Sequence, residues 1–450
     1  MNYKKIHPDL PIFIIPFNKC HILYCAGKIW VLSKEYYSNC KTFFEKNNYI
    51  DWQNAPLYVQ ELYRHAQYSQ NQWYSLIHQP FELECFTVYI SYDCNMNCSY
   101  CYNKQNRDKK GLKVNLEYVE AVGRYAAQEC RQRQRDLVFV LHGGGEPTYH
   151  WSYMQSIYHT VRKIASEYKI RLYSYIATNG LFTPQKALWL TENIGHIGIS
   201  CDGPSEIQSV QRYSKQSQKQ IEIIKANAKT ILDAGGKLDV RTTITPKSSS
   251  FQSQIVTFLS EDLRANMIHF EPVYRQENDG FNVNDAEQFV HDFLLAQKIA
   301  KERNSILLYS GVRPSELHSS YCDVFRNTIR LLPEGIISNC FYYSVDKLNH
   351  ILQIGEYDLK NKKFNILPNN IAELKHRMLV RPQKCLECIN QLHCSMGCPD
   401  SCLVCNPNNI QNNFRCKVNQ LLTLNWIFQT VEKAKVSKQN QLYGIPVEYF

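Results

Sequence analysis

Short apolar runs alternate with longer amphipathic stretches between about residues 86 and 310. The short runs are rich in β-branched and aromatic residues, as strands are, whereas the stretches between them, such as residues 116–130 and 220–234, repeat apolar residues at helical spacing. Alternating strands and helices predict a parallel sheet with right-handed crossovers, which is the α/β arrangement of a full or partial (β/α) barrel. The six predicted strands are residues 86–92, 137–142, 170–177, 196–200, 238–245 and 267–272.

The first 85 residues follow a different pattern. Two strand-like runs, residues 12–17 and 21–33, precede a helix-like stretch at residues 34–47. The pair Ala26 and Gly27 predicts a turn inside the second run. We therefore expect a small strand-rich N-terminal domain with helices after it, ending near residue 85.

Length and composition limit the class of protein. The chain has 450 residues, of which 44% are hydrophobic and 20% charged, so it can form two or three packed domains and does not have the composition of a disordered chain. No apolar run reaches the roughly 18 residues that a membrane span needs, and the polar start has no signal-peptide layout. We expect a cytoplasmic protein that does not bind membranes.

The net charge of +10 comes from dispersed side chains. Short basic clusters occur at residues 107–110 and 131–136, and a solvated helix face explains such clusters more often than a nucleic acid does. We therefore expect no nucleic-acid partner. The basic balance is compatible with an acidic peptide.

The chain contains 18 cysteines. Disulfides are a poor explanation, because the cytosol keeps thiols reduced and a chain of this length needs no covalent staples. Metal ligation is the other common use of many cysteines. Three of them, Cys94, Cys98 and Cys101, form a tight group, and nine more fall between Cys322 and Cys416.

The tight group lies in the segment CNMNCSYC, directly after the first predicted barrel strand. Three thiolates can hold three irons of a four-iron cluster and leave the fourth iron open for another ligand. Zinc is the alternative, but a structural zinc site needs a fourth Cys or His, and none lies nearby in the sequence.

This segment resembles the radical S-adenosylmethionine (SAM) superfamily, in which a CX3CX2C loop follows the first barrel strand and an aromatic residue precedes the last cysteine. Tyr100 has that position here. The resemblance implies that Cys94, Cys98 and Cys101 hold the reducing cluster and that the amino and carboxylate groups of SAM chelate its open iron. It also implies that Tyr100 packs near the adenine.

Three further strand ends carry polar groups where a barrel ligand would meet them, and the resemblance assigns residues of two of these regions to SAM. The second strand ends in HGGGEP, in which Gly144, Gly145 and Glu146 match the superfamily's GGE motif. Glycines let a backbone approach a ligand closely, and a carboxylate can pair with an ammonium group. By the same resemblance Ser200 and Arg212, near SCDGP, contact the ribose and carboxylate, while ATNG and DGP also fit ordinary turns.

The C-terminal cysteines follow two fixed spacings. Cys322, Gly335 and Cys340 fit CX12GX4C, and the later group fits CX2CX5CX3CX17C. Both spacings resemble the SPASM extension of radical SAM enzymes, which holds two auxiliary four-iron clusters. Zinc binding by the CX2C pairs is the alternative. The resemblance assigns the outer cluster to Cys385, Cys388, Cys394 and Cys416, and the inner cluster to Cys322, Cys340 and Cys398, whose fourth ligand is Cys402, Cys405 or an open position.

Together these motifs predict an α/β fold with a partial (β/α)6 TIM-like barrel over residues 86–312. A small N-terminal α+β domain (1–85) and a C-terminal iron–sulfur cluster domain (313–450) would flank the barrel. Residues 1–85 also have the character of leader-peptide recognition modules, in which a leader adds a strand to a sheet edge. Packing against the open side of the barrel is the alternative role.

The resemblance implies a peptide-modifying oxidoreductase with three [4Fe–4S] clusters and SAM. A 5′-deoxyadenosyl radical would abstract hydrogen from a ribosomally made precursor peptide, and the product would be a crosslink or a related change of backbone or side chain. The implied partners are the precursor peptide, an electron donor such as flavodoxin or ferredoxin, and, if residues 1–85 do not bind the leader, a separate leader-binding protein. Alternatives are a sulfatase-maturing enzyme that makes formylglycine, and a non-catalytic metal-cluster scaffold.

Overall fold

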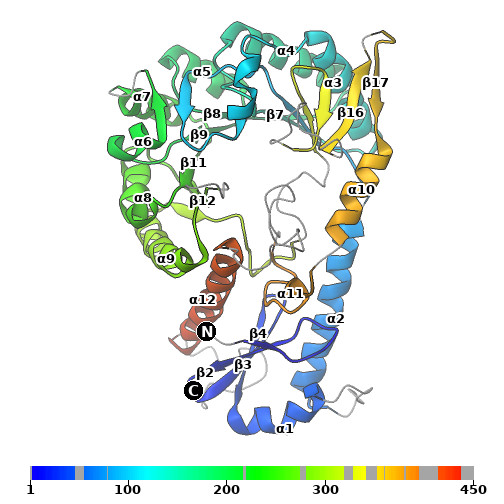
Figure 1. Ribbon diagram of the computed structural model, residues 1–450, viewed down its shortest axis with the longest axis vertical. Helices are drawn as coiled ribbons and strands as arrows, with labels where there is room; N and C mark the ends of the chain where they lie inside the picture. Colours follow the sequence, from blue (N-terminus) through cyan, green and yellow to red (C-terminus); the bar gives the residue numbers. More distant parts are fainter. Residues whose placement is uncertain are drawn as a thin grey trace.

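A large curved sheet organises the middle of the chain (Figure 1). Its centre is six parallel strands that lie side by side in chain order, and these confirm the six strands predicted from the sequence. They are β5 (Cys85–Val88), β7 (Leu137–Leu141), β8 (Leu172–Thr178), β9 (His196–Ser200), β11 (Leu238–Ile244) and β12 (Met267–Pro272). The computed structural model describes residues 3–45, 55–78, 80–215, 219–273, 280–318, 328–340, 352–358, 360–379, 382–394 and 414–436.

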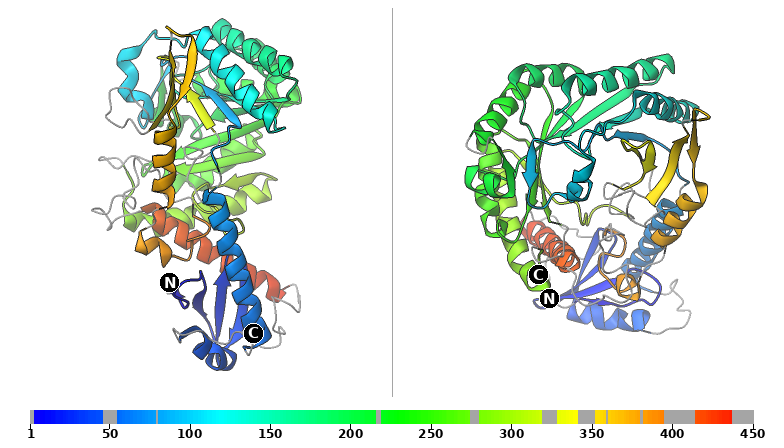
Figure 2. Two further views of the ribbon diagram at one scale, coloured as in Figure 1. Left: turned by 90° about the vertical axis from the view of Figure 1, so that its right-hand side faces the viewer. Right: turned by 45° about the horizontal axis from the view of Figure 1, so that its top comes forward.

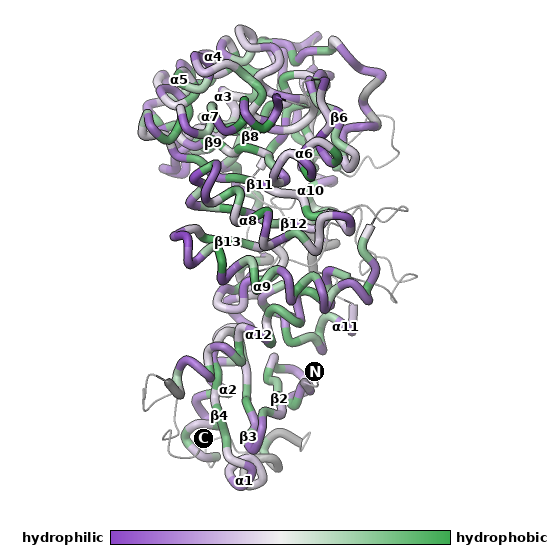
Figure 3. Tube along the Cα trace, turned by 90° about the vertical axis from the view of Figure 1, so that its left-hand side faces the viewer, coloured by the Kyte–Doolittle hydropathy of each residue, from purple (hydrophilic) through white to green (hydrophobic). Residues whose placement is uncertain are grey.

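Helices between these strands cover the outer face of the sheet, and the right-hand view of Figure 2 shows them as a curved wall. Each buries one apolar stripe, as Val119, Val122 and Ala126 do in α3, while its other side stays polar. Figure 3 shows this mixture of green and purple along α8 and α9. The helices are α3 (Leu116–Gln132), α4 (Trp151–Glu167), α5 (Pro184–Asn193), α6 (Ser205–Gln211), α7 (Gln220–Asp233), α8 (Gln252–Glu261) and α9 (Ala286–Glu302), with short 3-10 turns η2 (Tyr102–Lys109), η3 (Ser249–Phe251) and η4 (Val283–Asp285).

The sheet continues beyond the six central strands at both edges. Strand β13 (Ile306–Leu308) pairs in parallel with β12, and β14 (Thr328–Leu331) pairs in parallel with β5. Strands β15 (Ile336–Ser338), β16 (Gln353–Asp358) and β17 (Lys363–Ile366) then extend the sheet in antiparallel order, and α10 (Pro368–Leu379) follows. The segment expected to begin a separate C-terminal domain therefore shares a sheet with the barrel.

A second sheet forms the N-terminal unit, at the opposite end of the molecule in Figure 1. It has the order β1 (Lys4–Lys5), β2 (Phe13–Phe17), β3 (Cys20–Cys25) and β4 (Lys28–Ser33). The turn between β3 and β4 is Ala26–Gly27, with φ values of 47° and 83°. Two positive φ values in a two-residue turn match the right-handed twist of the strands. Helices α1 (Lys34–Glu45) and α2 (Leu57–His78) follow.

The N-terminal sheet lies between two helices that are far apart in the chain. One face buries Trp30 and Leu32 against Leu62 of α2. The other face buries Ile22 and Val31 against α12 (Phe414–Val436) and the segment after α11 (Gln383–Leu386). The N-terminal unit therefore shares a hydrophobic core with the C-terminal cysteine region. In the described parts of the chain, none of the helices is both long and apolar enough to cross a membrane.

Candidate active site

A short two-stranded sheet holds the loop that carries the first three cysteines. Strand β6 (Met96–Cys98) pairs with β10 (Arg212–Ser214), so that Cys98 lies opposite Arg212. The backbone N–H of Ser99 also donates to the carbonyl of Gln211 at 2.8 Å. The segment that follows β9 therefore fixes the shape of the cysteine loop.

The three thiols of this loop influence one another electrostatically. Burial raises the pKa of Cys94 to about 12, and the charges of Glu146, Cys98 and Cys101 act in the same direction. Bound iron would remove this penalty, because a coordinating thiol is deprotonated by the cation. The site therefore fits a group that supplies positive charge to all three sulfurs. Among the described side chains, no three of His, Cys, Asp or Glu gather as they would around one metal ion.

The glycine turn after β7 lies against the backbone that leads into the cysteine loop. The N–H of Gly145 donates to the carbonyl of Ser91, and the N–H of Glu146 donates to that of Asp93, both at 2.8 Å. A Cβ on Gly145 would lie 1.9 Å from the Asp93 carbonyl oxygen. Gly145 was expected to let a ligand approach closely, and in the structure it lets the backbone of Asp93 approach closely. This contact places the turn beside Cys94.

The Glu146 carboxylate ties the ends of β7 and β8 together. Its Oε1 accepts hydrogen bonds from the backbone N–H of Thr148 at 3.1 Å and from the hydroxyls of Thr148 and Thr178 at 2.7 and 2.6 Å. Its Oε2 accepts from the backbone N–H of Asn179 at 2.8 Å. Since each carboxylate oxygen has about two lone-pair sites, Oε2 keeps room for one further donor.

Asn179 extends this network to the cysteine loop. Its side-chain Nδ2 donates to Oδ1 of Asn95 at 2.6 Å and lies 4.0 Å from the sulfur of Cys94. The sequence ATNG marked this strand end, but its motif did not single out Asn179. The structure shows that the amide links the GGE segment to the first cysteine.

A partly buried polar network joins Tyr100, Asp202 and Arg212. The Tyr100 hydroxyl donates to Oδ2 of Asp202 at 2.6 Å and accepts from Nη1 of Arg212 at 2.8 Å. The backbone N–H of Thr243 holds Oδ1 of Asp202 at 3.0 Å. The arrangement brings Tyr100 and Arg212 together, both of which the sequence singled out. Asp202, which completes the group, was missed, although its place directly after a barrel strand was a usable signal.

Arg212 acts on the cysteine loop through its charge. Its Nε is buried and has no hydrogen-bond partner among the described residues. The positive charge of Arg212 opposes the effect of burial on the pKa of Cys98, which is raised overall. Ser200 lies at the end of β9, half-buried and opposite Arg241 in the sheet register. Both residues therefore lie at the same end of the barrel as the cysteine loop.

Charged side chains also face the barrel interior. Burial and the charges of Arg241 and Arg330 lower the pKa of His142 to about 3. Arg241 lies on β11, Arg330 lies on β14, and His142 follows β7. Because other strands separate these three in the sheet, their side chains approach one another across the barrel interior. Two carboxylates lie in the same region: Asp239 contacts His196 at 2.7 Å, and Glu271 accepts from the N–H of Ser310 at 2.9 Å.

The four cysteines predicted to hold the outer cluster lie within the described residues. The N–H of Cys388 donates to the carbonyl of Cys385 at 3.3 Å. Two residues about one turn after Cys416 in α12 approach sulfurs of this set: Asn419 lies 3.4 Å from Cys394 Sγ, and Gln420 lies 3.6 Å from Cys388 Sγ. The start of α12 thus lies against the sulfurs of Cys388 and Cys394.

The predicted inner set is described only in part. Cys340 is buried after β15, and Gly335 forms the preceding turn with φ of +83°, which explains the glycine in the spacing. Cys322, Cys398, Cys402 and Cys405 lie outside the described residues.

A model of the radical SAM superfamily matches residues 88–247. A cysteine-type anaerobic sulfatase-maturating enzyme of Clostridium perfringens is 22% identical over 276 residues, which cover 56% of this chain and 73% of that protein.

Two solved structures share the fold. Native anSMEcpe with bound AdoMet superposes with a TM-score of 0.61 at 16% identity, covering 78% of this chain and 99% of that one. Streptococcus suis SuiB bound to precursor peptide SuiA gives a TM-score of 0.50 at 14% identity, covering 88% and 95%. The family match, the cysteine loop and the glycine turn together show that residues 88–247 form a radical SAM domain, the kind of enzyme domain that works with SAM and a [4Fe–4S] cluster.

Proposed function

We propose that this enzyme is a maturase of ribosomally made peptides that oxidises a residue of a precursor peptide and installs a crosslink or a related change. The observation that carries the proposal is the core shared by the N-terminal sheet and the cysteine-bearing C-terminal region, which would place a peptide-binding sheet beside the proposed outer cluster. The similarity to SuiB, whose structure holds a precursor peptide, supports it. A radical SAM domain leaves no support for a non-catalytic scaffold.

The proposed cofactor contacts follow from the site. Cys94, Cys98 and Cys101 would hold the cluster, and when bound, cluster and SAM supply a 5′-deoxyadenosyl radical that removes a substrate hydrogen. Arg212, with its unpartnered Nε, would bind the SAM carboxylate. Ser200 would bind the ribose and Tyr100 would pack near the adenine.

The GGE segment would bind the amino end of SAM. Glu146 is held by four protein donors, so its main task is to position the turn, with Oε2 as the acceptor still available to an ammonium group. Gly144 and Gly145 would shape the turn that carries it. In this proposal the rigid network from Glu146 through Asn179 keeps the SAM site aligned with the cysteine loop.

The C-terminal cysteines would hold two further four-iron clusters. Cys385, Cys388, Cys394 and Cys416 would bind the outer one, and the contacts of α12 with the sulfurs of Cys388 and Cys394 support that assignment. Cys340, Cys322 and Cys398 would bind the inner one. Such clusters can accept the electron left on the substrate, since iron–sulfur potentials span about −700 to +450 mV.

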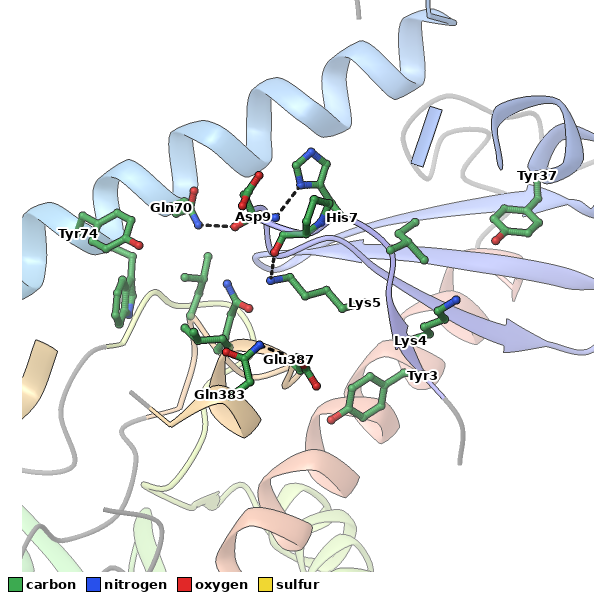
Figure 4. Close-up of a pocket in the computed structure, with 16 residues that line it drawn as sticks. Tyr3, Lys4, Lys5, His7, Asp9, Tyr37, Gln70, Tyr74, Gln383 and Glu387 are labelled. Atoms are coloured by element: carbon green, nitrogen blue, oxygen red, sulfur yellow. Dashed lines mark hydrogen bonds between the residues drawn. The ribbon is translucent and has the colours of Figure 1, made fainter. Parts of the chain in front are cut away.

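Precursor binding would involve the N-terminal unit. Strand β1 is the outermost strand of its sheet as described, and it borders a cavity of about 1070 Å³ between this sheet, α2 and α11 (Figure 4). Outer strands offer backbone groups to which an extended peptide can add. Trp73 and Tyr74 supply aromatic surface in the cavity, and Lys4 and Lys5 supply positive charge. The proposed ligand here is the leader of the precursor peptide.

Formylglycine formation is the second candidate. The sulfatase-maturating relative favours it, and the barrel offers the carboxylate that such chemistry needs as a proton acceptor. Asp239 and Glu271 lie on β11 and β12, and Glu271 is at the strand's C-terminal end, where barrel enzymes place reactive groups. The sequence alone did not locate this carboxylate.

One anaerobic assay separates the candidates. The enzyme would be incubated with reductant, SAM and the short peptide encoded beside its gene, and in parallel with a cysteine-containing sulfatase peptide. Intact mass would then be measured. Loss of two hydrogens from the first peptide supports crosslinking. Loss of sulfur and two hydrogens with gain of one oxygen in the second peptide, which converts a cysteine CH2SH into an aldehyde, supports formylglycine formation. Cleavage of SAM with both peptides unchanged would contradict both assignments.

A further inference from the structure

A tyrosine of the N-terminal unit reaches a cysteine of the proposed outer cluster. The hydroxyl of Tyr3 lies 3.8 Å from the sulfur of Cys388, within hydrogen-bonding range for sulfur. Tyr3 directly precedes β1, and its ring packs edge-to-face on Phe13 of β2, with ring centres 6.0 Å apart. The N-terminal core thus holds the hydroxyl in place. Tyr3 also lines the cavity in Figure 4, as does Glu387, which precedes Cys388 in the chain.

Two side chains of α12 approach sulfurs of the same set. Nε2 of Gln420 lies 3.6 Å from Cys388 Sγ, and Nδ2 of Asn419 lies 3.4 Å from Cys394 Sγ. The Tyr309 hydroxyl donates to Oδ1 of Asn419 at 2.9 Å, which turns the amide nitrogen toward the sulfur. Donors from the N-terminal unit and from α12 therefore converge on two neighbouring cysteines.

The direction of these hydrogen bonds is fixed once the cysteines bind iron. A ligating cysteine is a thiolate, which has no proton to donate. The tyrosine hydroxyl and the amide nitrogens must then be the donors. Hydrogen bonds to the sulfurs are among the factors that set the potential of an iron–sulfur cluster. Because they stabilise negative charge, they favour the reduced form, which carries one more electron.

We propose that Tyr3 and Gln420 are positioning residues that raise the reduction potential of the outer cluster through Cys388. The N-terminal unit, besides any role in peptide binding, thereby helps to set how readily this cluster accepts an electron. The inference rests on the proposed function only in that Cys385, Cys388, Cys394 and Cys416 hold a four-iron cluster.

The test is a redox titration followed by electron paramagnetic resonance. It uses the full chain with Cys94, Cys98 and Cys101 replaced by alanine, so that the two auxiliary clusters give the signals. Tyr3→Phe keeps the ring and removes the donor. In this variant the equilibrium constant for reduction of one cluster should fall about three- to tenfold. At 59 mV per tenfold, this moves one of the two transitions to a potential about 30 to 59 mV more negative. The other transition should stay in place.

Two further variants sharpen the result. Gln420→Met removes the second donor at similar length and should shift the same transition in the same direction, with a larger shift in the double variant. Tyr74→Phe is the matched control, because Tyr74 lines the same cavity and is 47% exposed. It should shift neither transition.

The failures of the two proposals are distinguishable. Full iron and sulfide content with unchanged potentials in both Tyr3→Phe and Gln420→Met would overturn this inference and leave the cluster assignment intact. If the parent chain lacks the outer cluster, it will bind about four irons in place of the roughly eight that two clusters hold. That result would overturn both this inference and the cluster assignment.

Discussion

The hydroxyl oxygen of Tyr24 lies 2.8 Å from Nε2 of His393. Tyr24 belongs to β3 of the N-terminal sheet, and His393 directly precedes Cys394. The other ring nitrogen, Nδ1, lies 2.6 Å from the carbonyl oxygen of Glu316, so Nδ1 carries the proton and Nε2 accepts from Tyr24. This buried chain of hydrogen bonds fastens the N-terminal sheet to the cysteine-bearing segment.

Removal of the Tyr24 hydroxyl should loosen this connection. Tyr24→Phe leaves the buried Nε2 of His393 without its donor, and an unsatisfied buried acceptor costs about 1 to 3 kcal/mol. We expect a lower Tm in calorimetry and faster loss of iron to a chelator. Tyr173→Phe is the control, because Tyr173 is 49% exposed, and it should change neither quantity. Equal stability of the two variants would mean that the contact does not join the two regions.

The glycine turn gives a sharper packing prediction. Gly145→Ala would place a methyl group 1.9 Å from the backbone oxygen of Asp93, and backbone cannot swing aside as a side chain can. We expect a loss of about 3 kcal/mol in unfolding free energy and poor cluster reconstitution, because Asp93 precedes Cys94. Thermal unfolding and iron content measure these effects.

Gly235→Ala provides the comparison for that substitution. Gly235 has a φ of +79°, and no described atom lies within 4 Å of the position that a methyl group would take, so alanine there meets only backbone strain of about 1 to 2 kcal/mol. It should leave cluster content unchanged. If Gly145→Ala reconstitutes as well as Gly235→Ala, the close approach of the turn to the cysteine loop is not needed for cluster binding.

The sequence predicted these features unevenly, for physical reasons. The six barrel strands were predictable because their apolar runs are local and regular. The cysteine loop was predictable because its three cysteines lie within one short segment, so their spacing can be read directly from the sequence. Asp202 was not, because its role depends on Tyr100 and Arg212 reaching it from other segments. The packing of α12 on the N-terminal sheet was not predictable either, because the local sequence of each segment does not indicate which distant segment it contacts.

His142 predicts a pH dependence of stability. Burial and two arginines lower its pKa to about 3 in the folded protein, below the value of about 6.5 in an unfolded chain. The unfolded chain therefore binds more protons between these two values, so the contribution of His142 is complete above about pH 6.5 and is lost as the pH falls toward 3. His142→Asn should reduce the loss of Tm between pH 7 and about pH 5.

The control for that measurement is His291→Asn, which changes an exposed histidine on α9. Its pH profile of Tm should follow that of the unaltered protein. A His142→Asn profile that also follows the unaltered protein would show that His142 is hydrated in the folded state and does not face the arginines of the barrel interior.

Replacement of Cys94, Cys98 and Cys101 by alanine tests the central assignment of the active site. These cysteines lie in and around β6, whereas the outer set lies near α12 and a separate core, so loss of the first group should not disturb the second. We expect iron to fall from about twelve to about eight atoms per chain and 5′-deoxyadenosine formation to stop.

Cys130→Ala is the control, because Cys130 is buried on α3 and its thiol contacts the carbonyl of Leu83. It should keep full iron content and full cleavage of SAM. Continued cleavage in the triple variant would place the reducing cluster elsewhere, and loss of all iron would show that the C-terminal clusters depend on the barrel loop.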